Sequence, residues 1–106
     1  MARQELLAFA SGSATVTNAA KAISHADFSW SAGELAAADM AEYSSYTQAT
    51  NYLPDGGTPT ATFGIPLAAA ETRTIRGNAN IQATQFIRQG GVDSTMSVVL
   101  YKLEGT

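Results

Sequence analysis

The C-terminal half of the chain alternates between apolar and polar residues with a period of two, which is typical of β-strands that bury one face. The stretch "TATFGIPL" places Phe63, Ile65 and Leu67 on one side. Pro66 indicates an edge strand or a strand end, because proline cannot donate a ladder hydrogen bond. "ETRTIRG" then predicts a short polar strand, which closes in a turn at "RGNAN".

The segment "NIQATQFIRQ" predicts a further strand, with Ile81, Ala83 and Ile87 on one face and Phe86 on the other. The two glycines of "GGVDS" tolerate positive φ, so this segment is expected to be a hairpin loop. The last strand, "TMSVVLYKLE", is apolar on both faces. We therefore expect it to lie inside a sheet with something packed on each side. Residues 72–104 together predict a meander.

The N-terminal half predicts strands at "ELLAF" and "SATVT", and a further pair of strands from "AKAIS" to "ADFSW". Ser31 and Glu34 in "SAGELAAADMAEY" have the spacing of a capping box. Helical spacing continues through Leu35, Ala38, Asp39, Glu42 and Tyr43, and the alanines favour a helix. A helix over about 32–43 is the interpretation, with the alternative that "AEYSSYTQ" is a strand. Residues 51–62 predict a loop that could make contacts through Tyr52.

These elements predict a mainly β fold, an antiparallel β-sandwich or small barrel with one short α-helix at about 32–43. The 106 residues suit a single β domain, 1–106, in which residues 1–10 form either a first strand or an extended N-terminal arm laid on a neighbour.

The composition indicates a small core and a sparsely charged surface. Leucine, isoleucine, valine and phenylalanine make 20 residues, and alanine alone makes another 20. Charged residues are 14% of the chain and the formal net charge is −3, which is weak protection for a freely exposed surface. The balance favours a surface covered by copies of the chain or by a partner. No basic stripe is present, so nucleic-acid binding is not expected.

Cysteine is absent, which excludes disulfides and thiolate metal ligands. The start, "MARQELLAFASGS", has an apolar run too short for a signal peptide, and no stretch is long enough to span a membrane. We expect a chain made and used without secretion through such a signal, and without a membrane partner.

Ser24, His25 and Asp27 have the residue types of a hydrolase triad. On a strand, however, adjacent side chains point to opposite faces, and no nucleophile elbow is nearby. Asp39 and Glu42 would share one face of the expected helix and could hold a hard cation, although such a pair is usually just solvated. Gly56 and Gly57 lead into a strand and indicate a turn. We therefore predict no catalytic, metal or cofactor-binding residues, and no enzyme.

Trp30, Tyr43, Tyr46 and Tyr52 lie around the expected helix and the segment after it. These side chains combine a large contact area with a polar group, which suits a protein interface, a sugar-stacking platform or simply the core. The N-terminal apolar residues are further interface candidates. The full set of candidates is Trp30, Tyr43, Tyr46, Tyr52, Leu6, Leu7 and Phe9.

The strand series "FGIPLAAAETRTIRGNANIQATQFIRQGGVDSTMSVVLYKLE" resembles, in its general character, the small structural proteins of tailed-bacteriophage virions, such as capsid decoration (cement) or head-fibre proteins. The resemblance implies a non-enzymatic protein present in many copies, made in the host cytoplasm and located in the virion. Its partners would be itself, a major capsid protein or another virion protein. It carries over no functional residue.

Two alternatives remain beside this function. One is a carbohydrate- or receptor-binding β module that uses the Trp and Tyr side chains, and the other is a small hydrolase that uses His25.

Overall fold

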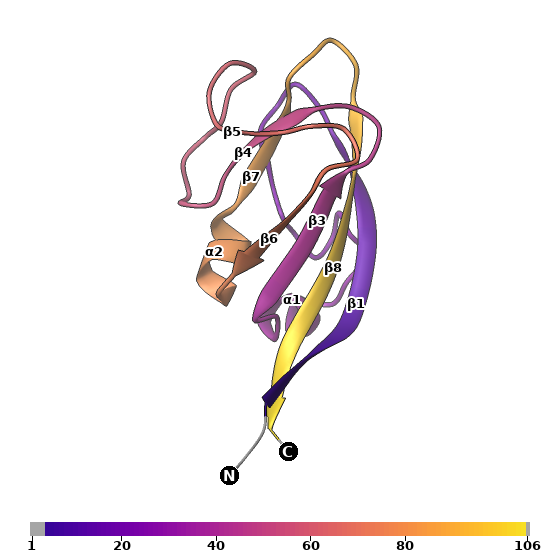
Figure 1. Ribbon diagram of the computed structural model, residues 1–106, viewed down its shortest axis with the longest axis vertical. Coiled ribbons are helices and arrows are strands. Elements are labelled where there is room, and N and C mark those ends of the chain that lie inside the picture. Colours follow the sequence, from indigo (N-terminus) through magenta and orange to yellow (C-terminus); the bar gives the residue numbers. More distant parts are fainter. Residues whose placement is uncertain (1–3, 106) are drawn as a thin grey trace.

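The computed structural model describes residues 4–105 as two four-stranded antiparallel sheets packed as a sandwich, with two short helices (Figure 1). The elements in chain order are β1 (Gln4–Val16), β2 (Lys21–Ala22), α1 (Ala32–Ala36), β3 (Met40–Ser45), β4 (Thr50–Leu53), β5 (Ile65–Leu67), β6 (Thr72–Arg76), α2 (Asn78–Ala83), β7 (Gln85–Arg88) and β8 (Ser94–Gly105). The predicted mainly β sandwich is confirmed. Residues 4–10 begin the first strand, and residues 1–3 of the possible arm lie outside the described residues.

The strand order is β1-β8-β3-β6 in the first sheet and β2-β7-β4-β5 in the second. The expected meander over residues 72–104 is therefore wrong, because β6 pairs with β3, β7 pairs with β4, and β8 lies between β1 and β3. "GGVDS" crosses from one sheet to the other instead of closing a hairpin, and neither of its glycines has positive φ. Alternation shows which face a strand buries, but pairing partners depend on contacts distant in sequence.

The capping box at the start of α1 is confirmed. The Glu34 amide donates to Ser31 Oγ at 3.1 Å, and the Ser31 amide donates to Glu34 Oε1 at 2.9 Å. The helix nevertheless ends at Ala36, not near residue 43, and Met40–Ser45 is a strand. As a strand, this segment hydrogen-bonds to both β8 and β6 and buries Tyr43. These tertiary contacts stabilise the strand by more than the local helix propensity of the segment favours a helix.

The helix α2 replaces the first half of the strand expected over residues 80–89, which is reduced to β7. Gly77, with φ of 87°, lets the chain reverse before the helix. The Asn78 side chain donates to the carbonyls of Leu35 and Ala38, so a tertiary contact also holds the helix start. Phe86 and Ile87 are both buried, because β7 is a central strand of its sheet.

The core lies between the two sheets and receives side chains from both sheets, from both helices and from the turn after β2. Six large side chains are almost wholly buried there, with exposed fractions of 0–1%: Tyr43, Leu67, Ile81, Met96, Val98 and Leu100. Of the three residues expected on one buried face of "TATFGIPL", only Leu67 is buried, while Phe63 and Ile65 are exposed. The reason is that β5 is an edge strand of three residues, as Pro66 indicated.

The molecule is elongated, with extents of 50 × 23 × 23 Å. Figure 1 shows why: β1 and β8 run side by side and continue beyond the rest of the sandwich, so that Gln4 and Gly105 are paired at one tip. The inner face of β8 packs on the core, but its outer face does not receive the expected cover. Val99 and Tyr101 there are only half-buried, and Leu103 is exposed.

Candidate interaction surface

The tip of the molecule is a two-stranded ribbon, formed by residues 4–8 of β1 and residues 101–105 of β8, which we call the terminal ribbon. Its register runs from Gln4 opposite Gly105 to Ala8 opposite Tyr101. The third strand of the sheet, β3, begins opposite Tyr101, so the ribbon beyond this point has only its own two strands. A two-stranded ribbon is marginally stable by itself in water.

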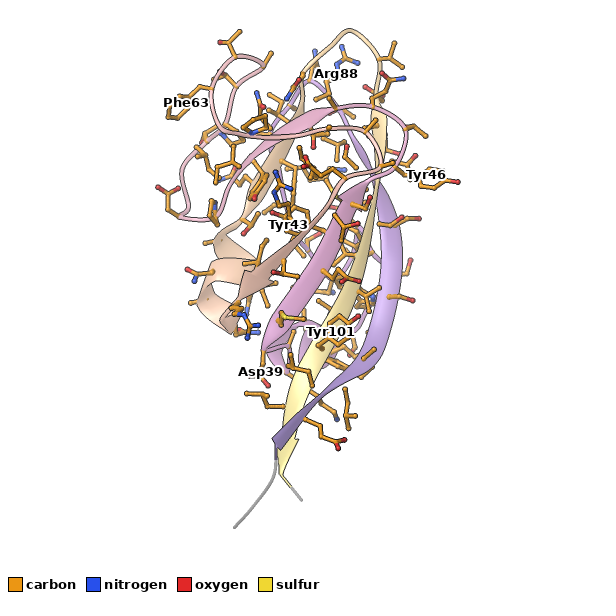
Figure 2. The ribbon with its side chains drawn as sticks, viewed as in Figure 1. Asp39, Tyr43, Tyr46, Phe63, Arg88 and Tyr101 are labelled. Carbon is orange, nitrogen blue, oxygen red and sulfur yellow. The ribbon has the colours of Figure 1, made fainter. Side chains whose placement is uncertain are left out.

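Asp39 anchors the ribbon where it leaves the body of the sandwich (Figure 2). Its amide donates to the carbonyl of Tyr101 at 2.8 Å, and its carboxylate Oδ2 accepts from the amide of Leu103 at 2.7 Å. This carboxylate takes the place of a neighbouring strand for one backbone donor. Asp39 is therefore a positioning residue of the ribbon and does not lie on a helix.

The terminal ribbon exposes apolar side chains on both of its faces. Leu6 and Leu103 are direct partners and so share one face, with exposed fractions of 36% and 49%. Leu7 points to the other face and is 39% exposed. Exposed apolar side chains gathered in one place are typical of an interaction surface, whereas isolated ones are not informative.

A β-bulge joins the ribbon to the body. The register of β1 against β8 shifts between Ala8 and Ala10, which leaves Phe9 without a direct partner. Phe9 packs partly against the core, and the Lys102 ammonium lies 5.4 Å from the centre of its ring. Beside the bulge, a shallow groove of about 360 Å³ is lined by Ala8, Phe9, Ala10, Ser11 and Val99. The groove extends the apolar surface of the ribbon.

Sequence reasoning selected Leu6, Leu7 and Phe9, and the structure brings all three to the ribbon and its bulge. It missed Leu103 as an interface residue. The signal was present, because the last strand is apolar on both faces. Only the structure shows that one of these faces is left uncovered where β3 and the second sheet have ended.

The four aromatic candidates do not form one surface. Trp30 stacks on Phe28 with ring centres 4.7 Å apart, and Tyr43 packs edge-on against Tyr52 at 5.0 Å. These three candidates are buried, while Tyr46 is 68% exposed and projects from the β3–β4 turn (Figure 2). A stacking platform of all four rings is therefore not available to a sugar.

The Tyr43 phenol is held neutral inside the sandwich. Burial raises its pKa far above the ordinary value, and the neighbouring Tyr52 raises that pKa further. The Tyr43 hydroxyl has no hydrogen-bond partner of normal geometry among the described residues. This tyrosine is a core residue, and neither its exposure nor its pKa suits proton transfer to a ligand.

Ser24, His25 and Asp27 lie in a turn after β2, where a strand was expected. Ser24 Oγ donates to Asp27 Oδ2 at 2.8 Å, so the hydroxyl is bonded directly to the carboxylate. The backbone carbonyl of His25 accepts a hydrogen bond from the Trp30 amide. The imidazole of His25 is exposed and makes no hydrogen bond to Ser24 or Asp27. A hydrolase triad requires the histidine to lie between the serine and the carboxylate, and here it does not.

Asp39 and Glu42 do not share a helix face, because Asp39 lies in the loop after α1 and Glu42 lies on β3. Glu42 lies on the outer face of β3, where its carboxylate accepts from the Tyr101 hydroxyl at 3.5 Å, while Asp39 binds the ribbon. Within residues 4–105, no cluster of three or more histidine or acidic side chains has the proximity needed to hold a metal ion. No helix described in that range is long and apolar enough to cross a membrane.

A second, open cleft of about 400 Å³ lies between β6 and the loop after β4. Two of its polar side chains make hydrogen bonds to nearby backbone groups: Asp55 Oδ1 accepts from the Gly57 amide, and Asn80 donates to the carbonyl of Arg76. Comparison of the chain with protein-family models, with curated proteins and with solved structures finds no match. The geometry of the terminal ribbon is therefore the main guide to function.

Proposed function

We propose that this chain is a non-enzymatic structural protein of a virus particle, which decorates or stabilises a capsid or another part of the virion. It would act through self-association or through contacts with a major capsid protein or another virion protein. The observation that supports this proposal is the terminal ribbon, which presents Leu6, Leu7 and Leu103 on two strands with no third strand beside them.

Association would stabilise the ribbon in a way that the isolated chain does not. Full burial of one leucine side chain contributes about 1.5–3 kcal/mol. The three ribbon leucines are still partly exposed, so contact with a partner would bury further apolar area and stabilise the complex. The low fraction of charged residues, 14%, keeps the desolvation cost of a contact small. Exposed apolar side chains and a low fraction of charged residues are both expected of a protein that functions as part of an assembly.

The alternative of a carbohydrate-binding module has less support. It depends on an exposed aromatic platform, and Trp30, Tyr43 and Tyr52 are buried in the core instead. A receptor contact would have to use other exposed side chains, such as Tyr46. The apolar ribbon favours the structural function.

The proposal predicts that the purified chain forms oligomers which the ribbon leucines hold together. We would compare the wild type with a Leu6→Ser/Leu103→Ser variant by light scattering after size exclusion, over a wide range of concentrations. The wild type is expected to exceed the mass of one chain, 11.0 kDa, and the variant is expected to lose mass at equal concentration.

Val92→Ser is the matched control, because Val92 is 61% exposed in the loop between β7 and β8 and lies outside the ribbon. This control should retain the wild-type mass. A wild-type chain that stays monomeric up to about 1 mM would contradict self-association, since weaker contacts have little effect at ordinary concentrations. Binding to a capsid shell would then be the remaining form of the proposal to test.

A further inference from the structure

Three of the four sheet edges in this molecule carry features that discourage pairing with another chain. The edge strand β2 has only two residues, and β5 has three residues with Pro66 in the middle. The edge strand β6 carries Arg73 and Arg76. Short length, proline and charge are the usual protections of exposed strand edges.

The fourth edge, β1, lacks these protections over residues 10–16. It is 13 residues long, contains no proline, and carries one charged residue, Glu5, which lies in the terminal ribbon. Figure 1 shows β1 at the outside of its sheet, with β8 on one side only. Among the described residues, the backbone of β1 hydrogen-bonds to no strand other than β8.

The part of β1 beyond the bulge is suited to accept another strand. Residues 10–16 pair one to one with residues 94–100 of β8 without any irregularity, so their free edge is regular. The sequence "ASGSATV" in this run is uncharged, and the outward-facing Ser11, Ser13 and Thr15 are small and exposed. A partner strand can therefore approach without a steric or electrostatic barrier.

We propose that this edge pairs with the same edge of a second copy of the chain. The two β1 strands would run antiparallel about a two-fold axis at Ser13, the centre of the regular run, and would join two four-stranded sheets into one of eight strands. This inference rests on the proposed function, because it adds to the contact made by the ribbon leucines a second self-contact of defined geometry.

A second copy is the occupant that the charge pattern favours. The two-fold axis places Ala10 opposite Val16, Ser11 opposite Thr15, and Gly12 opposite Ala14, so no like charges meet across the new pair. A second copy also supplies a strand of the same length and twist, already held straight by β8. The two terminal ribbons then point in opposite directions, which leaves them free for the contacts proposed above.

The test uses charge at the two-fold axis. Ser13→Lys would place two lysine side chains directly opposite each other in the dimer, with their Cβ atoms about 5 Å apart, so that their like charges repel. Thr72→Lys is the matched control, since Thr72 lies in the same cross-strand row through Ser97 and Ser44, on the opposite edge of the sheet. Both variants should keep the circular dichroism of the wild type and, at concentrations where the wild type is monomeric, its thermal unfolding.

Sedimentation equilibrium would measure the dissociation constant of the dimer. We expect Ser13→Lys to raise it by about tenfold or more, and Thr72→Lys to leave it unchanged. Ser13→Glu alone should weaken the dimer in the same way. An equimolar mixture of the Lys and Glu variants should restore wild-type affinity as a mixed dimer, because opposite charges then meet at the axis.

Unchanged association of Ser13→Lys would overturn the inference, and so would an equal loss in Thr72→Lys. If the Leu6→Ser/Leu103→Ser variant still lost mass in either case, the proposed function would stand and only the pairing of the β1 edges would fail. A monomeric wild type would also overturn the inference, whereas binding of that monomer to a capsid shell would keep the proposed function.

Discussion

The two halves of the β1–β8 pair have the same kind of hydrogen-bond ladder but very different surroundings. In the body, Met96, Val98 and Leu100 of β8 are 0–1% exposed, and β3 pairs along their free side. In the terminal ribbon, Leu6 and Leu103 are 36% and 49% exposed, and no third strand is present. The ladder resumes on the far side of the bulge at Phe9, whereas the packing on the core does not extend into the ribbon.

The difference separates what folds the chain from what the chain offers to a partner. Burial of apolar area is the main stabilising contribution in a domain, and the body half makes it. The ribbon half adds backbone hydrogen bonds, whose net contribution is small because water competes for the same groups. The leucines of the ribbon are therefore expected to matter little for folding and much for association.

The largest expected effect comes from a truncation in the body half. Met96→Ala removes a wholly buried side chain and should lower the free energy of unfolding by about 2–5 kcal/mol. Leu103→Ala, made on the same strand but in the ribbon, should change it by no more than about 0.5 kcal/mol. Denaturant unfolding of the monomer measures both. Equal losses would mean that the ribbon is part of the folding core, and the contrast between the halves would be lost.

An intermediate effect is expected where the body half meets the turn after β2. A Cβ atom at Gly12 would lie 2.5 Å from the carbonyl oxygen of Phe28, so Gly12→Ala must displace the backbone of that turn. We expect a loss of about 1–3 kcal/mol, as for other overpacked sites, again measured by denaturant unfolding.

Gly90→Ala is the matched control for this substitution. Gly90 has open space around its Cβ position and no positive φ, so alanine there should stabilise the chain by about 0.4–1 kcal/mol through the unfolded state. A Gly12→Ala variant as stable as the control would show that the turn yields easily and does not hold β1 on the core.

Local patterns predicted those features of the fold that local interactions decide. The stretch "TMSVVLYKLE" (residues 95–104), apolar on both faces, predicted β8, and the spacing of Ser31 and Glu34 predicted the helix start, since a capping box involves neighbouring residues only. Pro66 likewise predicted an edge strand correctly. Each signal depends on a few consecutive residues.

Features decided by distant contacts were not predictable in this way. The segment 40–45 has helical spacing, but it became a strand because β8 and β6 lie on either side of it. Residues 78–83 became a helix whose start is held partly by hydrogen bonds from the Asn78 side chain to the carbonyls of Leu35, in α1, and Ala38, just after it. Phe63 is exposed because the edge strand β5 has only three residues and begins after it. The alternation of apolar and polar residues predicts a longer strand than the one that forms.

The candidate surface was predictable to a similar extent. Leu6 and Leu7 were selected because the apolar N-terminal segment could form an arm laid on a neighbour, and the structure places both in the ribbon. Trp30 and Tyr43 were selected by residue type, and type alone cannot distinguish an interface from a core. Leu103 required the knowledge that β3 ends before it.

The smallest expected effect lies at the edge of the body farthest from β1. Glu71 precedes β6, and its carboxylate accepts from the Ala68 amide at 2.9 Å and from Arg73 Nη1 at 2.6 Å. The hydrogen bond from Ala68 lowers the pKa of Glu71, and Arg73 lowers it further. A carboxyl with a lowered folded-state pKa stabilises the fold above its unfolded pKa, and this contribution is lost as the pH falls through the folded value.

Glu71→Gln should therefore lower the melting temperature slightly at neutral pH, and the difference from the wild type should vanish in acid, where the carboxyl is protonated in both states. Thermal unfolding over a pH series measures this. Because the pair is exposed, added salt should reduce the part of the effect that depends on Arg73. A difference that persisted unchanged at low pH would indicate that Glu71 stabilises the fold by packing and not by its charge. The β6 edge would then be stabilised by packing, as the body half of β1–β8 is.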